Sequence, residues 1–350
     1  MKKTARFLIT GCIWGTVMMT AACSRPQTEG TPQSTDENEK QETLQNTGTL
    51  DDETASSDAG ALRTVMAEYD ENLKAILGEG LIYEILEDED NNTLAMMVAT
   101  YNDVALEDIT IPDTVIYEDK EYKVTEIKAS AFESNALLQK ITLPEGIRNV
   151  GDSAFYSCPE LTEVVLSDTV ESIGESCFAE CGKLSAVTMS KSLISIGMEA
   201  FCNCTALESI MIPAKTASFG SAVFYGCESL EKCLIEEGVS QIGAEMFTNC
   251  YALKDIDIPD SVTVIGEEAF WYCTSLTNLE LSEYVITIGD GAFYGSGITD
   301  LTIRSVSVQP AESMLRGCDE LKTIYVPKQN IASYESAYSS RGCKIEAVQE

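Results

Sequence analysis

One residue spacing limits what this chain can fold into: phenylalanine recurs every 23 residues from Phe132 to Phe293, and Leu315 closes the series after a step of 22. The repeated stretch runs from Ile127 to Val326 and contains nine units. Self-similarity at a fixed period of this length indicates a repeat protein. The intervening members of the series are Phe155, Phe178, Phe201, Phe224, Phe247 and Phe270.

Each unit contains a short alternating stretch, such as Ile141 and Leu143, in which every second residue is apolar. Alternation of this kind predicts a short strand with one buried side. Proline follows the pair in several units, as at Pro144, and ends the strand because its nitrogen cannot donate a hydrogen bond. Glycine stands four residues before each phenylalanine from Gly151 to Gly289 and marks a repeated turn. Since one coil cannot bury its own apolar side, the coils must stack into a solenoid.

Units such as LTEVVLSDTVESIGESCFAEC and LKDIDIPDSVTVIGEEAFWYC resemble the BspA-type leucine-rich repeats of bacterial surface proteins. The resemblance covers nine consecutive units and more than half of the chain. It implies a curved solenoid used for adhesion or binding outside the cell, usually without catalysis. We therefore expect a leucine-rich-repeat solenoid over residues 127–326, β-rich with one short strand per coil of 22 or 23 residues, and with an amino-terminal helix and β-hairpin as its cap.

Residues 1–22 have the features of an export signal. Lys2, Lys3 and Arg6 form a positively charged start, and an apolar run of 16 residues follows. That run is shorter than the ~20 residues that a membrane-spanning helix needs. We expect the segment to be removed during export.

The apolar run ends in Thr20-Ala21-Ala22-Cys23, which resembles the lipobox read by the lipoprotein signal peptidase. The resemblance makes Cys23 the acylated first residue of the mature protein, anchored by its lipid to the membrane at the bacterial cell surface. The family pattern favours leucine where Thr20 stands. The alternative is ordinary secretion with cleavage near Ala22.

Two segments lie between Cys23 and the caps of the solenoid. Residues 23–60 are rich in Ser, Thr, Gln, Asn, Gly and acidic residues, and predict a disordered acidic tether. In residues 61–79, apolar residues recur at helical spacing and predict an amphipathic helix. Its polar side is mostly acidic, so packing on the solenoid end is favoured over binding to anionic lipid.

A β-rich amino-terminal cap is predicted for residues 80–126. Residues 81–86 and 94–101 read as a hairpin with an acidic turn between its strands. The turn places oxygens at alternate positions as a calcium loop does, but Thr93 and Ala99 stand where an EF-hand needs Gly and Glu, so a plain acidic turn is favoured.

The first rung of the array and the opposite cap are also predicted. Residues 109–112 match the strand of the next unit, with nine residues inserted and a hairpin tip at 117–122. Residues 327–350 form a carboxy-terminal cap, with a short helix at 329–339 and a last strand at 344–348. These segments cover the otherwise open ends of the stack.

Seven of the 13 cysteines stand three residues after the large apolar residue of their unit. Disulfides are common in exported proteins, but side chains in such a ladder point in parallel rather than at one another, so buried thiols are favoured. A linear row does not supply the tetrahedral set that a metal needs. Cys177 and Cys202 lie off the ladder. The ladder is Cys158, Cys181, Cys204, Cys227, Cys250, Cys273 and Cys318.

Composition argues against catalysis and against polyanionic partners. The chain has no histidine, so it lacks the Ser-His and Cys-His pairs of nucleophilic enzymes. Paired carboxylates could make a glycan-acting enzyme, but among 57 acidic residues such pairs arise without meaning. The net charge of −34 repels phosphate backbones, so we expect no nucleic acid partner. The sequence has no histidine zinc ligand and no phosphate-binding loop, so we expect no cofactor.

Two outward-facing rows are candidate binding surfaces for an extracellular protein or glycan. One comprises the single outward residue of each strand, and the other the residue after each phenylalanine. Both could instead cover the core of a neighbouring coil. The candidates are Val165, Met211 and Leu234 in the first row, and Tyr225, Trp271 and Tyr294, with Tyr272 beside Trp271, in the second.

The sequence favours a binding module that is lipid-anchored at the cell surface. A structural cell-envelope lipoprotein without a dedicated ligand is the second hypothesis, and an enzyme is the third.

Overall fold

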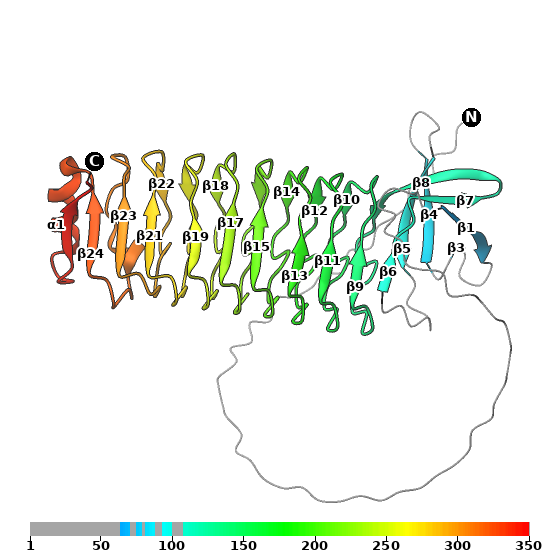
Figure 1. The fold of residues 1–350 in the computed structure, drawn as a ribbon, viewed down its shortest axis with the longest axis horizontal. Coiled ribbons are helices and arrows are strands. Elements are labelled where there is room, and N and C mark those ends of the chain that lie inside the picture. Colours follow the sequence, from blue (N-terminus) through cyan, green and yellow to red (C-terminus); the bar gives the residue numbers. More distant parts are fainter. Residues whose placement is uncertain (1–63, 71–74, 79–80, 88–92, 100–107, 350) are drawn as a thin grey trace, which may run out of the picture. The chain divides into compact units, whose positions relative to one another are not determined.

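In the computed structural model the coils follow one another as a row of parallel strands between two caps, as Figure 1 shows. The buried side chains of the coils form one continuous core. The predicted signal peptide, Cys23, the tether and the acidic turn of the first hairpin lie outside the described residues. The structure describes residues 64–70, 75–78, 81–87, 93–99 and 108–349.

The strand face consists of parallel, in-register strands, one from each coil. Ile109 pairs with Ile141 across the first two strands, which confirms the disguised first rung. The prediction of a leucine-rich-repeat solenoid is confirmed. The strands are β6 (Asp108–Thr110), β9 (Lys140–Thr142), β11 (Glu163–Val165), β13 (Ala186–Thr188), β15 (Ser209–Ile212), β17 (Lys232–Ile235), β19 (Asp255–Asp257), β21 (Asn278–Leu281), β23 (Asp300–Ile303) and β24 (Thr323–Val326).

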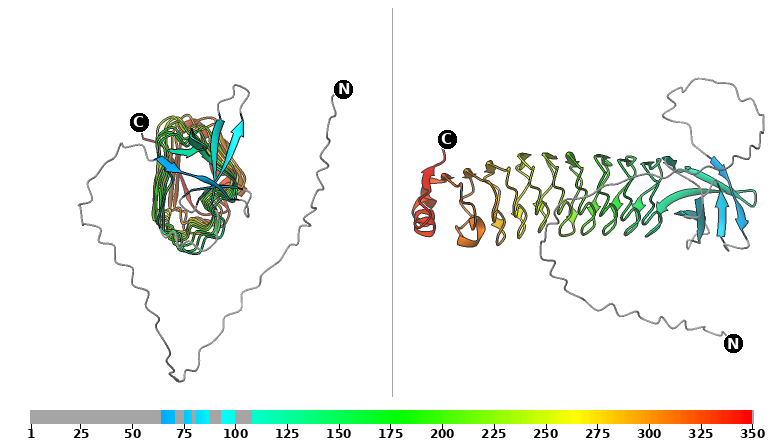
Figure 2. Two further views of the ribbon diagram at one scale, coloured as in Figure 1. Left: turned by 90° about the vertical axis from the view of Figure 1, so that its right-hand side faces the viewer. Right: turned by 90° about the horizontal axis from the view of Figure 1, so that it is seen from below.

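Most coils have a second strand, of two residues, which the sequence analysis did not anticipate. Seen end-on, the coils superpose closely (Figure 2). These strands are β10 (Asn149–Val150), β12 (Ser172–Ile173), β14 (Ser195–Ile196), β16 (Ser218–Phe219), β18 (Gln241–Ile242), β20 (Val264–Ile265) and β22 (Thr287–Ile288).

The row of second strands is interrupted between β16 and β18. Between β14 and β16, the Gly220 nitrogen donates to the Ile196 carbonyl at 2.9 Å. Between β16 and β18, both within the described residues, the Gly243 nitrogen makes no equivalent bond to the Phe219 carbonyl. The other strands of the row carry Val or Ile where β16 carries Phe219. We attribute the interruption to this larger, half-buried side chain.

A turn segment of five residues is centred on each phenylalanine. The backbone nitrogens of its first, third and fifth residues donate to carbonyls of the next coil: Ser153 to Glu175 at 2.7 Å, Phe155 to Cys177 at 2.8 Å and Ser157 to Ala179 at 2.8 Å. Ser153 and Ser157 have positive φ angles of 54° and 55°. Non-glycine residues rarely adopt such angles, so bonds to the neighbouring coil hold the segment in shape.

The core is a stack of phenylalanine rings beside a ladder of thiols. Neighbouring rings lie 4.9–5.7 Å apart with interplanar angles of at most 17°. Each ladder cysteine donates to the carbonyl of the phenylalanine one coil earlier, as Cys158 does to Phe132 at 3.1 Å and Cys250 to Phe224 at 3.2 Å. Burial raises the pKa of Cys227, so this thiol keeps the proton it donates. The ladder cysteines are free and buried, as expected for core residues.

The repeated glycine is required by the close approach of adjacent coils. A Cβ atom on Gly174 would lie 2.5 Å from the Asp152 nitrogen, and one on Gly197 would lie 2.5 Å from the Glu175 nitrogen. Contacts this short cannot be accommodated without moving the backbone. Any side chain at these positions would therefore push the coils apart.

The amino-terminal cap extends the row of second strands. β4 (Leu81–Glu87) and β5 (Thr93–Ala99) form the expected antiparallel hairpin. β7 (Thr114–Tyr117) pairs with β8 (Lys120–Ile127) around Glu118 and Asp119, whose positive φ angles fit a type I′ turn and confirm the second hairpin tip. β8 pairs with both β5 and β10, which joins cap to solenoid.

The amphipathic helix predicted for residues 61–79 is wrong. The structure has β1 (Thr64–Met66), β2 (Glu68–Asp70) and β3 (Ala75–Gly78) there. β1 pairs with β7, and β3 pairs with β2 and β4. The cap sheet offers open edges whose backbone groups a strand can satisfy and a helix cannot, so tertiary pairing overrides the helical spacing.

The carboxy-terminal cap has the expected helix and strand. α1 (Ile331–Tyr338) buries Tyr334 and Tyr338, and β25 (Lys344–Ala347) pairs in parallel with β24. Two short 3-10 helices, η1 (Glu312–Leu315) and η2 (Lys328–Asn330), precede α1. Of the helices in the described part of the chain, none has the length and apolarity to cross a membrane.

Candidate functional site

Three of the predicted aromatic residues meet on the surface of the turn segments. The Trp271 ring stacks on the Tyr294 ring of the next coil, with centroids 4.0 Å apart and planes 14° apart. The Tyr272 ring stands edge-on to both, at centroid distances of 6.0 Å and 5.8 Å. The structure thus brings together three side chains that the sequence only placed in neighbouring positions.

Two glycines of the next coil make room for these rings. A Cβ atom on Gly291 would lie 3.1 Å from the Trp271 ring, and one on Gly295 would lie 2.9 Å from the Tyr272 ring. Both glycines have positive φ, as does Tyr272 at 56°. The rings therefore lie over bare backbone, and 41% of Tyr272 remains exposed to solvent.

Two further tyrosines extend this surface over the two preceding coils. Tyr225 follows Phe224 and is half-buried, as predicted for the outward row. Tyr251 is 41% exposed, and its carbonyl accepts hydrogen bonds from the Ser275 nitrogen at 3.1 Å and from Thr274 Oγ1 at 3.3 Å, just beyond Tyr272 on the next coil. The sequence analysis missed Tyr251, because it stands outside the row that follows the phenylalanines. We define the aromatic patch as Tyr225, Tyr251, Trp271, Tyr272 and Tyr294.

Carboxylates border the aromatic patch without basic partners. Burial and the neighbouring Glu245 and Glu267 raise the pKa of the Glu268 carboxyl. No ion pair in the described part of the chain includes these three residues or Glu228. The surroundings of the aromatic patch therefore carry uncompensated negative charge.

The strand face brings only part of the first predicted row together. Met211 and Leu234 are register partners, and Leu234 is 45% exposed. Val165 is half-buried and pairs with the exposed Thr188, and β13 and β15 belong to different sheets. The apolar surface is thus two adjacent side chains, followed by Asp257 on the next strand.

Basic side chains near the strand face are paired between coils. Lys140 contacts Glu163 at 2.8 Å, and Lys232 contacts Asp255 at 2.8 Å. In both pairs the partners are 23 residues apart, one period of the array. Exposed pairs of this kind contribute roughly 0–1 kcal/mol each. They leave little uncompensated positive charge for a ligand to meet.

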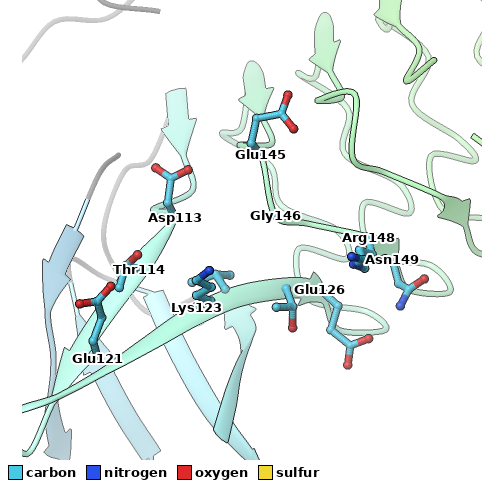
Figure 3. Close-up of a pocket in the computed structure, with 11 residues that line it drawn as sticks. Asp113, Thr114, Glu121, Lys123, Glu126, Glu145, Gly146, Arg148 and Asn149 are labelled. Carbon is cyan, nitrogen blue, oxygen red and sulfur yellow. The ribbon is translucent and has the colours of Figure 1, made fainter. Parts of the chain in front are cut away.

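A cleft of about 690 Å³ lies where β8 passes from the cap hairpin to the first coil (Figure 3). Its lining mixes acidic side chains, such as Asp113 and Glu121, with the basic Lys123 and Arg148. Arg148 is paired with Glu171 at 2.8 Å. The lining contains no aromatic ring, and its four acidic side chains against two basic ones do not by themselves select a ligand class.

No metal site or reactive thiol emerges from the described residues. Groups of three or more carboxylates or thiols placed to hold a metal ion are absent from this part of the chain. Off the ladder, burial raises the pKa of Cys177, and burial with Glu199 and Glu180 raises that of Cys202 to about 12. Both thiols are therefore protonated and poor nucleophiles at neutral pH.

A known family of repeat proteins matches the solenoid. The family model described as BspA type leucine rich repeat region matches residues 125–254 and 240–349, in six copies. Together these ranges span well over half of the 350 residues. No curated protein matches the chain.

Solved structures share the architecture. A leucine-rich repeat protein from Bacteroides ovatus is 21% identical, with a TM-score of 0.53 over 77% of this chain and 76% of that one. A leucine-rich repeat protein from T. pallidum is 20% identical, with a TM-score of 0.47 over 76% of this chain and 97% of that one. At such identities the likeness to the first shows the fold alone.

Proposed function

Because this chain belongs to the BspA-type leucine-rich-repeat family, we propose that it is a non-catalytic cell-surface lipoprotein whose solenoid binds an extracellular protein or glycan. The family match establishes the repeat scaffold. Ligand binding, lipid anchoring and location at the cell surface are the proposal.

The aromatic patch is the observation that carries the proposal. The interior is already filled by the phenylalanine stack, in which every ring from Phe132 to Phe293 is buried. Tyr251 and Tyr272 are not needed there and remain 41% exposed. Aromatic side chains that stay at the surface are enriched at binding interfaces, where one end of the ring is apolar and the other polar.

Lipid anchoring is tested by Cys23→Ser. We expect this variant to move from the membrane fraction to the soluble exported fraction, because the acylated thiol is removed. Metabolic labelling with a fatty acid gives a second measurement. If Cys23→Ser leaves both fractionation and labelling unchanged, the lipoprotein proposal is wrong.

Binding is tested by a screen of extracellular proteins and glycans against residues 24–350. Two variants assign the surface: Tyr272→Asn alters the aromatic patch, and Met211→Glu combined with Leu234→Glu alters the strand face. Saturable binding that either variant abolishes supports the proposal. If no ligand binds and cells lacking the protein adhere normally but have a weakened envelope, a structural lipoprotein is the better description.

A further inference from the structure

We propose that the ligand of the aromatic patch is a protein segment bearing arginine or lysine, with its cation held over the exposed rings and paired with the bordering carboxylates. This inference rests on the proposed binding function and names the partner chemistry of that site. The expected ligand is a basic protein segment and not a neutral glycan.

The rings provide faces on which a cation can lie. Tyr251 and Tyr272 are the most exposed members of the aromatic patch, and Trp271 is half-buried. A cation within about 6 Å of such a ring centroid is attracted by the negative face of the ring, most strongly for tryptophan. Because the Trp271 and Tyr294 rings are stacked together, a ligand would meet their outer sides and the face of Tyr272.

The bordering carboxylates supply the charge that selects a cation. Glu268 lies beside the Trp271 ring, since a Cβ atom on Gly291 would lie 3.1 Å from that ring and 3.4 Å from Glu268 Cγ. Burial, with the neighbouring carboxylates of Glu245 and Glu267, raises the pKa of the Glu268 carboxyl. No basic side chain in the described part of the chain forms an ion pair with any of the three. A guanidinium or ammonium group among these residues would relieve that repulsion. A neutral sugar would leave it in place.

The chain itself does not supply this cation within the described residues. Its cation–π contacts are those of Lys120 with Tyr122 and of Arg341 with Tyr338, both in the caps. Arg316 follows Tyr294 in the outward row, so the patch has one basic neighbour, at its carboxy-terminal end. The carboxylates on the preceding coils, including Glu228 and Glu245, remain open to an incoming cation.

Arginine should bind better than lysine. The guanidinium group is planar and less strongly hydrated, so it can stack on a ring while its nitrogens donate to a carboxylate. The lysine ammonium group is compact and strongly hydrated, so it cannot stack on a ring and donate to a carboxylate at the same time as well as a guanidinium group can. This preference separates a specific site from the general attraction of a chain with a net charge of −34 for any polycation.

Trp271 reports directly on the site. The other tryptophan, Trp14, lies in the predicted signal peptide, so residues 24–350 contain a single tryptophan. This fragment retains the whole compact unit from Asp58 to Glu350. Titration with a short oligoarginine peptide should change the Trp271 fluorescence saturably, with weaker binding by an oligolysine of equal length and none by oligoglutamate.

Matched variants separate the site from the rest of the surface. Tyr272→Asn removes the ring, and asparagine already occupies the equivalent positive-φ position at Asn203 and Asn249. A cation–π contact of ~0.5–2 kcal/mol corresponds to a roughly 2- to 30-fold loss of oligoarginine affinity. Tyr284→Asn makes the same change at a tyrosine that is 53% exposed but outside the aromatic patch, and should leave affinity unchanged.

The outcomes distinguish this inference from the proposed function. Equal affinities for Tyr272→Asn and Tyr284→Asn, or equal binding of oligoarginine and oligolysine, would overturn the basic-segment inference. So would a neutral polysaccharide that changes Trp271 fluorescence where oligoarginine does not. If an extracellular ligand binds but is lost only in the Met211→Glu/Leu234→Glu variant, the proposed function stands and the aromatic patch is not its site.

Discussion

The two halves of the repeat array share one interior but differ at the surface. Residues 127–220 carry 6 basic against 11 acidic residues, a net charge of −5, whereas residues 221–326 carry 5 against 17, a net charge of −12. The first half has Tyr156 as its only tyrosine or tryptophan, while the second contains the whole aromatic patch. The interrupted pairing between β16 and β18 lies at the boundary between them.

The comparison shows which features the fold requires. Both halves bury a phenylalanine and a cysteine in nearly every coil, with the same ring stacking and the same thiol-to-carbonyl bonds. Stacking of coils therefore does not depend on the added acidic and aromatic residues of the second half. Those residues are the ones on which the proposed binding function rests.

Deletion of coils tests the shared interior with the largest expected effect. Removing Ser221 to Gly243, one period of 23 residues, should leave a shorter folded solenoid, because each coil contacts only its neighbours. Removing Ser221 to Glu231 should unfold everything beyond it, since later core positions lose register. Thermal unfolding followed by circular dichroism compares the two; equal loss of structure would contradict the repeat architecture.

Truncation of the stacked rings tests whether the two interiors are equivalent. Phe155 and Phe224 are both fully buried, one in each half. Each change to alanine should destabilise the protein by about 3–5 kcal/mol, the usual range for emptying a buried aromatic site. Denaturant unfolding gives the values. Tyr156→Ala and Tyr225→Ala, one residue further on and half-buried, should cost much less.

Glycine substitution examines the boundary between the halves. A methyl group at Gly197 would lie 2.5 Å from backbone, but at Gly243 the closest atom is 3.2 Å away. We expect Gly197→Ala to cost about 1–3 kcal/mol, as overpacking does, and Gly243→Ala to cost less. The same unfolding measurement decides between them. A larger cost at Gly243 would mean that the boundary coils are packed more tightly than the structure shows.

The smallest expected effect concerns how ionisation of two carboxyl groups, Asp168 and Glu268, changes the stability of the folded state: one stabilises it and the other destabilises it. In the first half, Lys191 lowers the pKa of Asp168 in the folded state. The ionised Asp168 therefore stabilises the folded state at pH values above the pKa of this group in the unfolded chain. That stabilisation is lost as the pH falls through the pKa of the folded state. Burial and neighbouring carboxylates raise the pKa of Glu268 in the second half, so its ionisation opposes folding as pH rises through the folded pKa.

Asp168→Asn should therefore slightly lower the melting temperature at neutral pH, and Glu268→Gln should slightly raise it. Both differences should shrink as the pH falls below the range in which carboxyl groups ionise. Melting temperatures of the two variants and the unchanged protein, recorded from acidic to neutral pH, provide the test. Shifts of the same sign in both variants would contradict the electrostatic contrast between the halves.

The buried residues of the solenoid could be predicted from the sequence because they recur at the period of the repeat. A position that must contact its equivalent in the next coil, such as Phe224 or Cys250, has to be repeated, and so it appears as a row. The positive φ angles of Ser153 and Ser157 leave no such mark, since the equivalent positions hold Ser, Glu, Asn, Gly, Ala and Tyr. Only the hydrogen bonds between coils reveal why those angles are tolerated.

The candidate site could be predicted only in part. Trp271 and Tyr294 stand in one row of the sequence and lie together in the structure. Tyr251 occupies a position where other coils have Ala, Pro, Gly, Thr, Glu or Asp, so no row marks it. The strands within residues 64–70 and 75–78 are not predictable from the sequence, because local spacing carries no information about an open sheet edge elsewhere in the chain. Both cases concern contacts between segments that no internal pattern repeats.

The register of the array has a genetic consequence. One period of 23 residues is 69 nucleotides of coding sequence, so recombination between repeats adds or removes a coil without a frameshift and without disturbing the core. The aromatic patch does not tolerate every such exchange, because Trp271 and Tyr272 lie over glycines of the following coil. Unequal crossing-over between the coils of Phe132 and Phe201 would lengthen or shorten the protein and leave the aromatic patch unchanged. A crossover between Tyr272 and Gly291 would instead separate the Trp271 and Tyr272 rings from the glycines that make room for them.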